Sequence, residues 1–244
     1  MQGVSTVRLD KLLANLGYGS RKQIAQIVKA KRVARRGEII SKADEKVALD
    51  DALSGALTFD GERLDPPAPL TIMLHKPVGY TCSHKEAGDI VYDLLPPRWQ
   101  ARNPSLSSAG RLDKESTGQL IITDDGELLH RITHPKSKAP KHYEVTLERE
   151  LRGDEAALFA TGTFLMVDDD DPLKPAEWTA TSARSGRMVL HEGRYHQIRR
   201  MFATLGNLVT GLHRFQTGQL VLGELKAGEY RILGEEEIRA VTAG

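Results

Sequence analysis

The sequence predicts an α+β protein in which a small N-terminal module precedes a larger domain with a mainly antiparallel, mixed β-sheet. Three observations predict it. Helical spacing of apolar residues marks the first part of the chain, short Ile-, Leu- and Val-rich runs alternate with turn clusters in the rest, and a proline-rich stretch separates the two patterns. Because helices and strands do not alternate strictly, the strands should pair mainly antiparallel. We expect one domain over residues 1–65, a linker over 66–70 and a second domain over 71–244.

The composition excludes several classes of protein. An apolar content of 40% with 27% charged residues is typical of a globular protein. No apolar stretch reaches the roughly 20 residues that a membrane span needs, and the N-terminus lacks the apolar core of a secretory signal. The single cysteine, Cys82, excludes an intramolecular disulfide and a multi-cysteine zinc site, and we expect it to be an inert packed residue. We therefore expect a cytoplasmic protein without membrane contact.

The net charge of +1 conceals a strongly basic segment near the N-terminus. Between Asp10 and Glu38 the chain has no acidic residue. The basic residues in this interval are Lys11, Arg21, Lys22, Lys29, Lys31, Arg32, Arg35 and Arg36. A block of this density favours contact with a polyanion such as RNA or DNA, the alternative being a solvated helical face.

The N-terminal module is predicted to begin with two helices. Ser20 is expected to cap the second helix, with Gln23 completing a capping box. Two extended pieces then flank a glycine turn in VARRGEII, and a further strand-like stretch lies near Lys46–Leu49. The apolar residues at helical spacing in the first helix are Val7, Leu9, Leu12, Leu13 and Leu16.

This helix–turn–helix–hairpin order resembles the S4 RNA-binding domain. The resemblance is carried by RLDKLL and by SRKQIAQIVKAKRVARRGEII, in which the basic residues fall on the second helix and the loop after it. It implies that the module binds structured RNA. A generic α/β module of the same size is the alternative.

The second domain should contain five extended runs, namely LTIMLHKP, QLIITDDG, HYEVTL, RMVLHEG and QLVLGEL. Helices are expected over GELLHRITHP and RYHQIRRMFATLG. At about 100° per residue, Arg199 lies at the edge of the apolar face of the second of these helices, whereas Arg200 points toward solvent. The residues expected on that apolar face are Tyr195, Ile198, Met201, Phe202 and Leu205. The acidic run Asp168–Asp171 is expected to be a solvated turn.

One loop contains the strongest candidate for chemistry. In GRLDKESTGQLIITDDG, Asp113 lies between two glycines and directly before a strand, a place that can fix a carboxylate as a nucleophile or general base. A local ion pair with Arg111 is the plainer interpretation. Arg199, at the edge of its helix, is placed to pair with such a carboxylate and keep it ionised.

GRLDKESTGQLIITDDG resembles the signature loop of the RsuA-type pseudouridine synthases. LHKPVGYTCS, HYEVTL and EGRYHQIRRMFATLGNLV resemble further segments of that family and occur in its order, so the resemblance covers nearly the whole chain. It implies an enzyme that isomerises a uridine of ribosomal RNA to pseudouridine and needs no cofactor and no metal. The chain departs from the family at His75 and Gln119, where asparagine and leucine are usual. Gln119 is expected to alter the packing behind Asp113.

The resemblance also assigns roles to individual residues. It implies that Asp113, Tyr143 and Arg199 are catalytic, and that Arg111 helps to hold RNA once the target base has left the stack, since a stacked uridine cannot present its reacting atoms to a carboxylate. Which atom Asp113 attacks stays open between ribose C1′ and uracil C6, as does a role as base. The residues expected to contact RNA are Arg111, Arg21, Lys22, Lys29, Lys31, Arg32, Arg35, Arg36, Arg194 and Arg200.

The segment Leu212-His213-Arg214 and the S4-like module resemble the small-subunit enzymes of the family. They imply that the target is U516 of 16S rRNA, in naked RNA or in an assembly intermediate, and that the enzyme acts as a monomer. A 23S rRNA target is the first alternative. A non-catalytic RNA-binding factor for ribosome assembly is the alternative from another class.

Overall fold

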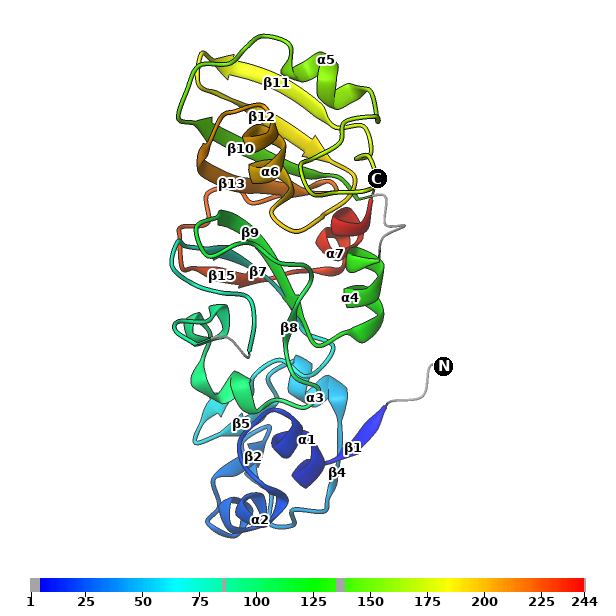
Figure 1. Cartoon of the computed structure of the whole chain (residues 1–244). Coiled ribbons are helices and arrows are strands. Elements are labelled where there is room, and N and C mark those ends of the chain that lie inside the picture. The colour runs from blue at the N-terminus through cyan, green and yellow to red at the C-terminus, as the bar shows by residue number, and fades with distance from the viewer. Residues whose placement is uncertain (1–4, 85–86, 135–138, 244) are drawn as a thin grey trace. The chain divides into compact units, whose positions relative to one another are not determined.

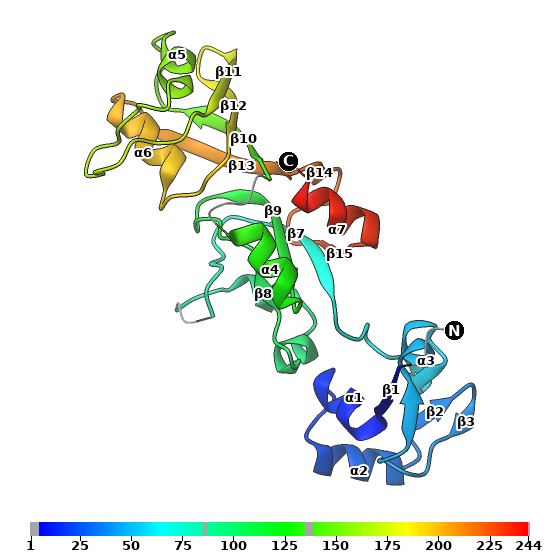
Figure 2. The same ribbon diagram turned by 90° about the vertical axis from the view of Figure 1, so that its right-hand side faces the viewer.

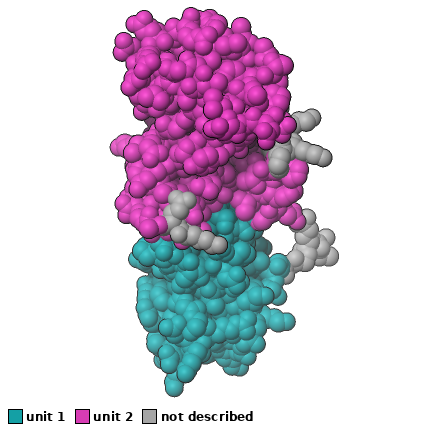
Figure 3. Space-filling view, viewed as in Figure 1, with its two compact units in different colours: residues 1–70, 95–107, 123–125 teal, residues 71–94, 108–122, 126–244 magenta. Residues whose placement is uncertain are grey.

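The computed structural model describes residues 5–84, 87–134 and 139–243. It divides into two compact units, which Figure 3 colours separately: residues 1–70, 95–107 and 123–125 form unit 1, and residues 71–94, 108–122 and 126–244 form unit 2. Among the described residues, no helix has both the length and the apolar character that crossing a membrane requires. The domain limits expected from the sequence stay a prediction.

Unit 1 contains a helical pair and two small sheets (Figure 1). The helices are α1 (Leu9–Asn15), α2 (Arg21–Lys29) and the short α3 (Leu49–Leu53). The strands are β1 (Thr6–Arg8), which pairs with β4 (Lys46–Ala48), and the four-stranded set β3 (Glu38–Ile39), β2 (Val33–Arg35), β5 (Leu57–Phe59) and β6 (Glu62–Arg63), in that order. Its core is aliphatic, and Leu9, Leu13, Ile24, Val33 and Leu57 are fully buried.

The predicted start of α2 is confirmed. The backbone N–H of Gln23 donates to the Ser20 hydroxyl, while the Gln23 side chain accepts from the Ser20 backbone at 2.8 Å, which completes the capping box. Val7 does not belong to the first helix as expected. It lies in β1, because its backbone pairs with that of Val47 in β4. The helix therefore begins at Leu9.

Unit 1 also includes two segments from later in the chain. Arg102 and Asp124 form an ion pair of 3.0 Å whose side chains are 1% and 0% exposed. The same two residues bind the proline-rich stretch: Arg102 donates to the carbonyl of Pro66, and Asp124 accepts from the backbone N–H of Leu70 at 2.6 Å. Because both charged groups are paired and hydrogen-bonded, they can be buried without the cost of an isolated charge. These contacts explain why 95–107 and 123–125 group with the first 70 residues.

Unit 2 is built on one mixed sheet, with the strand order β11-β12-β10-β13-β9-β7-β15 (Figures 1 and 2). The antiparallel neighbours are β11–β12, β12–β10, β10–β13 and β7–β15, whereas β9 and β13 run parallel. The mainly antiparallel sheet expected from the sequence is confirmed. The strands are β7 (Thr71–Lys76), β9 (Thr117–Thr123), β10 (Lys141–Leu147), β11 (Glu177–Ser182), β12 (Ser185–Leu190), β13 (Val209–Thr217) and β15 (Tyr230–Ile232), with short β8 (Ser107–Ser108) beside β9 and β14 (Leu220–Val221) beside β13.

Four helices cover this sheet. The two helices α4 (Gly126–Thr133) and α7 (Glu235–Thr242) lie side by side and share a core with Met73 and Ile121 (Figures 1 and 2). Helix α5 (Glu155–Ala160) packs near β11, and α6 (Gln197–Thr204) packs near β13. Two 3₁₀ turns, Val91–Leu94 and Pro97–Ala101, complete the described elements.

The helix expected over RYHQIRRMFATLG is shorter than predicted. His196 adopts a left-handed conformation (φ 48°, ψ 33°), so α6 begins only at Gln197. Ile198, Met201 and Phe202 are buried as expected. The prediction for Tyr195 is wrong, since its side chain is 73% exposed. The left-handed residue breaks the helical phase on which that prediction depended.

Candidate active site

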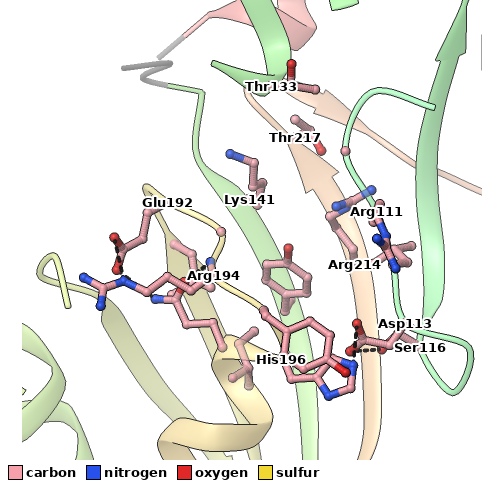
Figure 4. Close-up of a pocket in the computed structure, with 18 of the residues that line it drawn as sticks. Arg111, Asp113, Ser116, Thr133, Lys141, Glu192, Arg194, His196, Arg214 and Thr217 are labelled. Carbon is pink, nitrogen blue, oxygen red and sulfur yellow. Dashed lines mark hydrogen bonds and ion pairs between the residues drawn. The ribbon is translucent and has the colours of Figure 1, made fainter. Parts of the chain in front are cut away.

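A cavity of about 620 Å³ opens in unit 2 where four segments meet (Figure 4). Its wall comes from the loop 109–116, from β10, from β13 and from the turn that leads into α6. Figure 4 shows Asp113 and Ser116 on one side of the pocket, and Glu192 and Arg194 on the other. The predicted site residues that line the cavity are Arg111, Asp113, Tyr143 and Arg194.

A buried lysine holds the loop that carries Asp113. The Nζ atom of Lys76 donates to the carbonyls of Ser116 (2.8 Å), Pro77 (2.9 Å) and Lys114 (3.3 Å). Burial lowers the pKa of this ammonium, while the charges of Asp113 and Glu115 act in the opposite direction. Residue 76 is fully buried, so this loop is fixed from within the fold. The sequence analysis did not single out Lys76; its only signal is a lysine at the end of an apolar strand.

The loop is fixed at a second point by Cys82. Its Sγ lies 3.4 Å from both the backbone nitrogen and the carbonyl oxygen of Leu112, next to Asp113. Burial raises the pKa of the thiol, so it stays protonated at neutral pH. The cysteine is buried, as expected, and it also positions the loop backbone.

The carboxylate of Asp113 divides its two oxygens between different partners. Oδ1 lies 3.4 Å from Nε2 of His196, and Oδ2 lies 3.5 Å from Nε of Arg199 and 3.5 Å from the hydroxyl of Ser116. These distances exceed those of ordinary charge-assisted hydrogen bonds. The carboxylate is thus surrounded by donors but not closed off by them, and about a quarter of its side chain is exposed.

Arg199 is anchored independently of Asp113. Its Nη1 donates to the carbonyl of Val209 at 3.0 Å, which orients the guanidinium. Its Nε is buried and makes no hydrogen bond, although it lies within ion-pair distance of Asp113. The structure therefore brings together Asp113 and Arg199, which lie far apart in the sequence. It also brings His196 to the carboxylate. Helical periodicity does not predict this contact, because His196 is left-handed and lies before the first residue of α6.

Tyr143 lies on β10 opposite Met188 of β12 and Arg214 of β13. Its side chain is 9% exposed, and it shares a buried strand face with Val145 and Leu147. The ring is therefore part of the core and of the cavity wall at once.

Two further cations lie in the cavity wall. Arg214 is 5% exposed, and its Nε donates to the carbonyl of Gln119 at 2.8 Å. Burial lowers the pKa of Lys141, and the charge of Arg214 lowers it further. The wall thus presents positive charge beside Tyr143, suited to an anionic ligand.

Gln119, polar and fully buried, donates through Nε2 to the carbonyl of Leu220 at 2.8 Å.

Arg194 and Arg200 meet at a single carboxylate. Asp169 accepts from Arg194 at 3.0 Å and from Arg200 at 2.5 Å, and these hydrogen bonds, the one from Arg200 first, lower its pKa. Arg194 also donates to the carbonyls of Asp171 and Pro172. The acidic run is therefore not merely a solvated turn, and Arg200 does not simply point to solvent as expected.

His75 lies outside the cavity wall. Its Nδ1 forms a hydrogen bond of 2.6 Å with the carbonyl of Leu225, and its ring meets that of His213 edge-on at 5.3 Å. His213 in turn bonds Thr117 at 2.8 Å. Within the described residues, no cluster of three or more His, Cys, Asp or Glu side chains is arranged to hold a metal ion.

The seven basic residues of unit 1 that the sequence predicts to contact RNA fall into two groups. Arg32 pairs with Asp60, Arg35 with Glu45 and Arg36 with Asp51. The other four are exposed and form no ion pair with a described residue; they are Arg21, Lys22, Lys29 and Lys31. Of these seven residues, only the second group presents unneutralised charge.

Comparison with known proteins gives a consistent result. The family described as RNA pseudouridylate synthase matches residues 70–204, and the S4 domain matches residues 7–53. The ribosomal small subunit pseudouridine synthase A of Vibrio cholerae is 38% identical, over 96% of this chain and 99% of the relative. The protein of that name from Escherichia coli is 39% identical, over 96% of this chain and 100% of the relative. A crystal structure of a pseudouridylate synthase, 36% identical, superposes with a TM-score of 0.66 and covers 96% of this chain and 99% of its own.

Proposed function

Because the chain belongs to the RNA pseudouridylate synthase family and is a pseudouridine synthase with an S4 domain, we propose that its cavity takes one extruded uridine of small-subunit ribosomal RNA. One observation supports this most strongly. The carboxylate of Asp113 lies in the wall of a cavity large enough for a nucleoside, between two cationic or hydrogen-bonding partners, His196 and Arg199. The reaction breaks the bond between ribose C1′ and uracil N1, forms a bond between C1′ and C5, and moves the C5 proton to N1.

Asp113 is the proposed catalytic carboxylate. The Arg199 guanidinium, 3.5 Å away and anchored by Val209, places a positive charge beside this carboxylate. The loose contacts around the carboxylate leave it able to approach a substrate atom. Attack on ribose C1′, attack on uracil C6 and base action at the sugar all fit this arrangement.

Tyr143 is the proposed partner of the target base. Its ring is packed from behind by the core and faces the cavity, so it offers a preformed surface for a uracil. Stacking of a base on an aromatic ring contributes about 1–3 kcal/mol, which offsets part of the cost of removing the uridine from its own stack. Arg111, at the edge of the same cavity, is placed to contact the adjoining phosphate.

The substrate is proposed from the relatives together with the charges. The relatives described above are named ribosomal small subunit pseudouridine synthase A, which supports the RNA of the small subunit, 16S rRNA, as the substrate. Within it, U516 is the target that the sequence resemblance implies. The unpaired cations of α2 and the turn after it support RNA contact by the S4 domain.

The test is direct mapping of pseudouridine. The purified protein is incubated with a 16S rRNA transcript or with particles assembled from it, and new pseudouridines are located by carbodiimide-dependent stops of a primer. We expect one new stop, at U516, with the wild type and none with Asp113→Asn. The matched control is Asp44→Asn, an exposed carboxylate of unit 1 that should modify as the wild type does.

Two outcomes would contradict the proposal. A stop that persists with Asp113→Asn removes the catalytic role of that carboxylate. A stop in 23S rRNA, and none in 16S rRNA or its particles, would leave the enzyme class intact and replace the substrate.

A further inference from the structure

Tyr195 differs from every other aromatic residue of the chain. All 13 Phe, Tyr and Trp residues lie within the described part, and Tyr195 alone is exposed. Its side chain is 73% accessible although it lines the cavity that contains Asp113. Large aromatic side chains gain free energy from burial, so a tyrosine left open at the mouth of a site is an unusual arrangement.

The ring of Tyr195 has one covered face and one open face. It stacks on the imidazole of His196, with ring centres 3.9 Å apart and planes inclined by 16°. His196 in turn contacts Oδ1 of Asp113 through Nε2. Since the inner face lies against His196, the exposure of Tyr195 belongs to its outer face and edges.

The turn that carries Tyr195 is held at both ends. The backbone N–H of Arg194 donates to the Gln197 side chain at 2.9 Å, and the Gln197 amide donates to Glu192 at 3.0 Å. The Arg194 side chain is fixed by Asp169. A platform that is already ordered loses little conformational entropy when a ligand stacks on it.

We propose that Tyr195 is a stacking platform for the nucleobase that adjoins the target uridine in the RNA. The proposal rests on the proposed function. A base on the outer face of Tyr195 is separated from Asp113 by two rings, so it is not the base that reacts. It belongs to a neighbouring nucleotide, which the target's extrusion leaves without one stacking partner. Flat aromatic surfaces accept any base, and RNA-binding enzymes use them for unstacked nucleotides.

The experiment compares Tyr195→Ala, which removes the ring, with Tyr195→Phe, which keeps the ring and removes the hydroxyl. Affinity for unmodified 16S rRNA transcript is measured by filter binding. Loss of one stacked base predicts a Kd about tenfold higher or more for Tyr195→Ala, and a Kd near that of the wild type for Tyr195→Phe. The matched control is Val221→Ala, an exposed apolar residue outside the cavity wall, which should bind as the wild type does.

A second measurement identifies the base. Once the modified uridine is mapped, short RNAs carry an abasic nucleotide on its 5′ or its 3′ side. On one of the two sides, the abasic nucleotide should weaken binding by the wild type about as much as Tyr195→Ala weakens binding to intact RNA. The same abasic nucleotide should not weaken binding by Tyr195→Ala any further. If the affinity losses caused by the abasic nucleotide and by Tyr195→Ala are additive on both the 5′ and the 3′ side, Tyr195 does not stack on a neighbouring base and the proposal is refuted.

The binding comparison does not require turnover, so it separates this proposal from the proposed function. If the wild type binds the transcript but forms no pseudouridine in it or in particles assembled from it, the proposed substrate is wrong, while the ratio between the Ala and Phe variants still decides the role of Tyr195. Equal affinity of Tyr195→Ala and wild type, or equal loss in both Tyr195 variants with unchanged thermal unfolding, would refute stacking.

Discussion

Two helices of this chain, α2 and α6, each begin near a pair of adjacent basic residues, but they begin in different ways. Helix α2 is capped by Ser20 in a complete capping box, and its first two residues, Arg21 and Lys22, are exposed. The residue before helix α6, His196, is left-handed and makes no side-chain capping bond. Its pair, Arg199 and Arg200, is engaged by Asp113 and Asp169.

The difference shows which features depend on neighbours in the sequence and which on the fold. The start of α2 satisfies its backbone groups locally, so its cations remain available to an external polyanion. The start of α6 gives up a local cap, and the left-handed turn directs His196 toward Asp113. A residue in this conformation costs free energy that the surrounding contacts must offset, and such positions concentrate at functional sites.

The largest expected effect comes from breaking the pairing at α6. Arg199→Gln removes the charge beside Asp113, and we expect the single-turnover rate of pseudouridine formation to fall about 10²- to 10³-fold, as for loss of a preorganised electrostatic partner. Arg200→Gln is the matched control, because its partner is Asp169, and its rate should stay within a few-fold of the wild type. Equal losses in both variants would mean that the two arginines are not distinguished by their partners.

The next effect sharpens the role of α2. Changing Arg21, Lys22, Lys29 and Lys31 to Gln together should reduce the slope of log Kd against log salt concentration by about 0.7–0.9 for each phosphate that the protein no longer neutralises. Changing Arg32, Arg35 and Arg36 instead should reduce it less, because each is already paired within the protein. The measurement is transcript binding across a range of salt concentrations. A larger reduction from the paired set would contradict this division.

A smaller effect tests the local cap. Ser20→Ala removes the hydroxyl that accepts from Gln23 and should lower the free energy of unfolding by about 1 kcal/mol. Urea unfolding followed by circular dichroism measures it, with Ser41→Ala, an exposed serine outside any helix, as control. If the two variants are equally stable, the capping box contributes nothing measurable to α2.

The smallest effect concerns the ion pairs that Arg194 and Arg200 form with Asp169. Arg200 and Arg194 hold the pKa of Asp169 below its usual range, so the ionised form stabilises the folded state. This stabilisation is full well above the ordinary Asp pKa of about 3.9 and is lost as pH falls through the lower folded-state pKa. The urea midpoint of wild type should therefore exceed that of Asp169→Asn at pH 7, and the gap should narrow toward a pH of about 3.5. A gap that does not change with pH would show that the charge of Asp169 is not involved.

Much of the fold was predictable where local chemistry decides it. The capping box at Ser20, the glycine turn after β2 and the strands β7, β9, β10 and β12 follow from residues close together in the sequence. Of the expected run QLVLGEL only Leu220–Val221 forms a strand, and β11, β13 and β15 were not among the expected runs. The first helix shows the limit of that approach. Val7 has the right spacing for α1, but pairing with Val47, forty residues away in the chain, places it in a strand.

The candidate site was predictable where a residue's neighbours in the sequence are distinctive, and less so where tertiary contacts decide. Asp113 and Tyr143 stand in distinctive runs and both line the cavity. Lys76, by contrast, holds the site through the carbonyls of Lys114 and Ser116, which lie some forty residues away in the chain. Tyr195 and Arg200 were misplaced because helical periodicity was extended through a left-handed residue and because the carboxylate of Asp169 lies on a distant loop.

The close approach of β9 and β13 determines the distance between the two strands that position Asp113 and Arg199. Gly118 lies in β9 with φ +111°, and a Cβ there would stand 2.2 Å from the carbonyl oxygen of Arg214. The two parallel strands therefore approach as bare backbones, and no side chain can separate them without moving one of them. Asp113 precedes the first strand, and Arg199 is bonded to the start of the second at Val209. The distance between the Asp113 carboxylate and the Arg199 guanidinium therefore depends on residue 118 being glycine. Even alanine, the smallest other residue, would force the two strands apart.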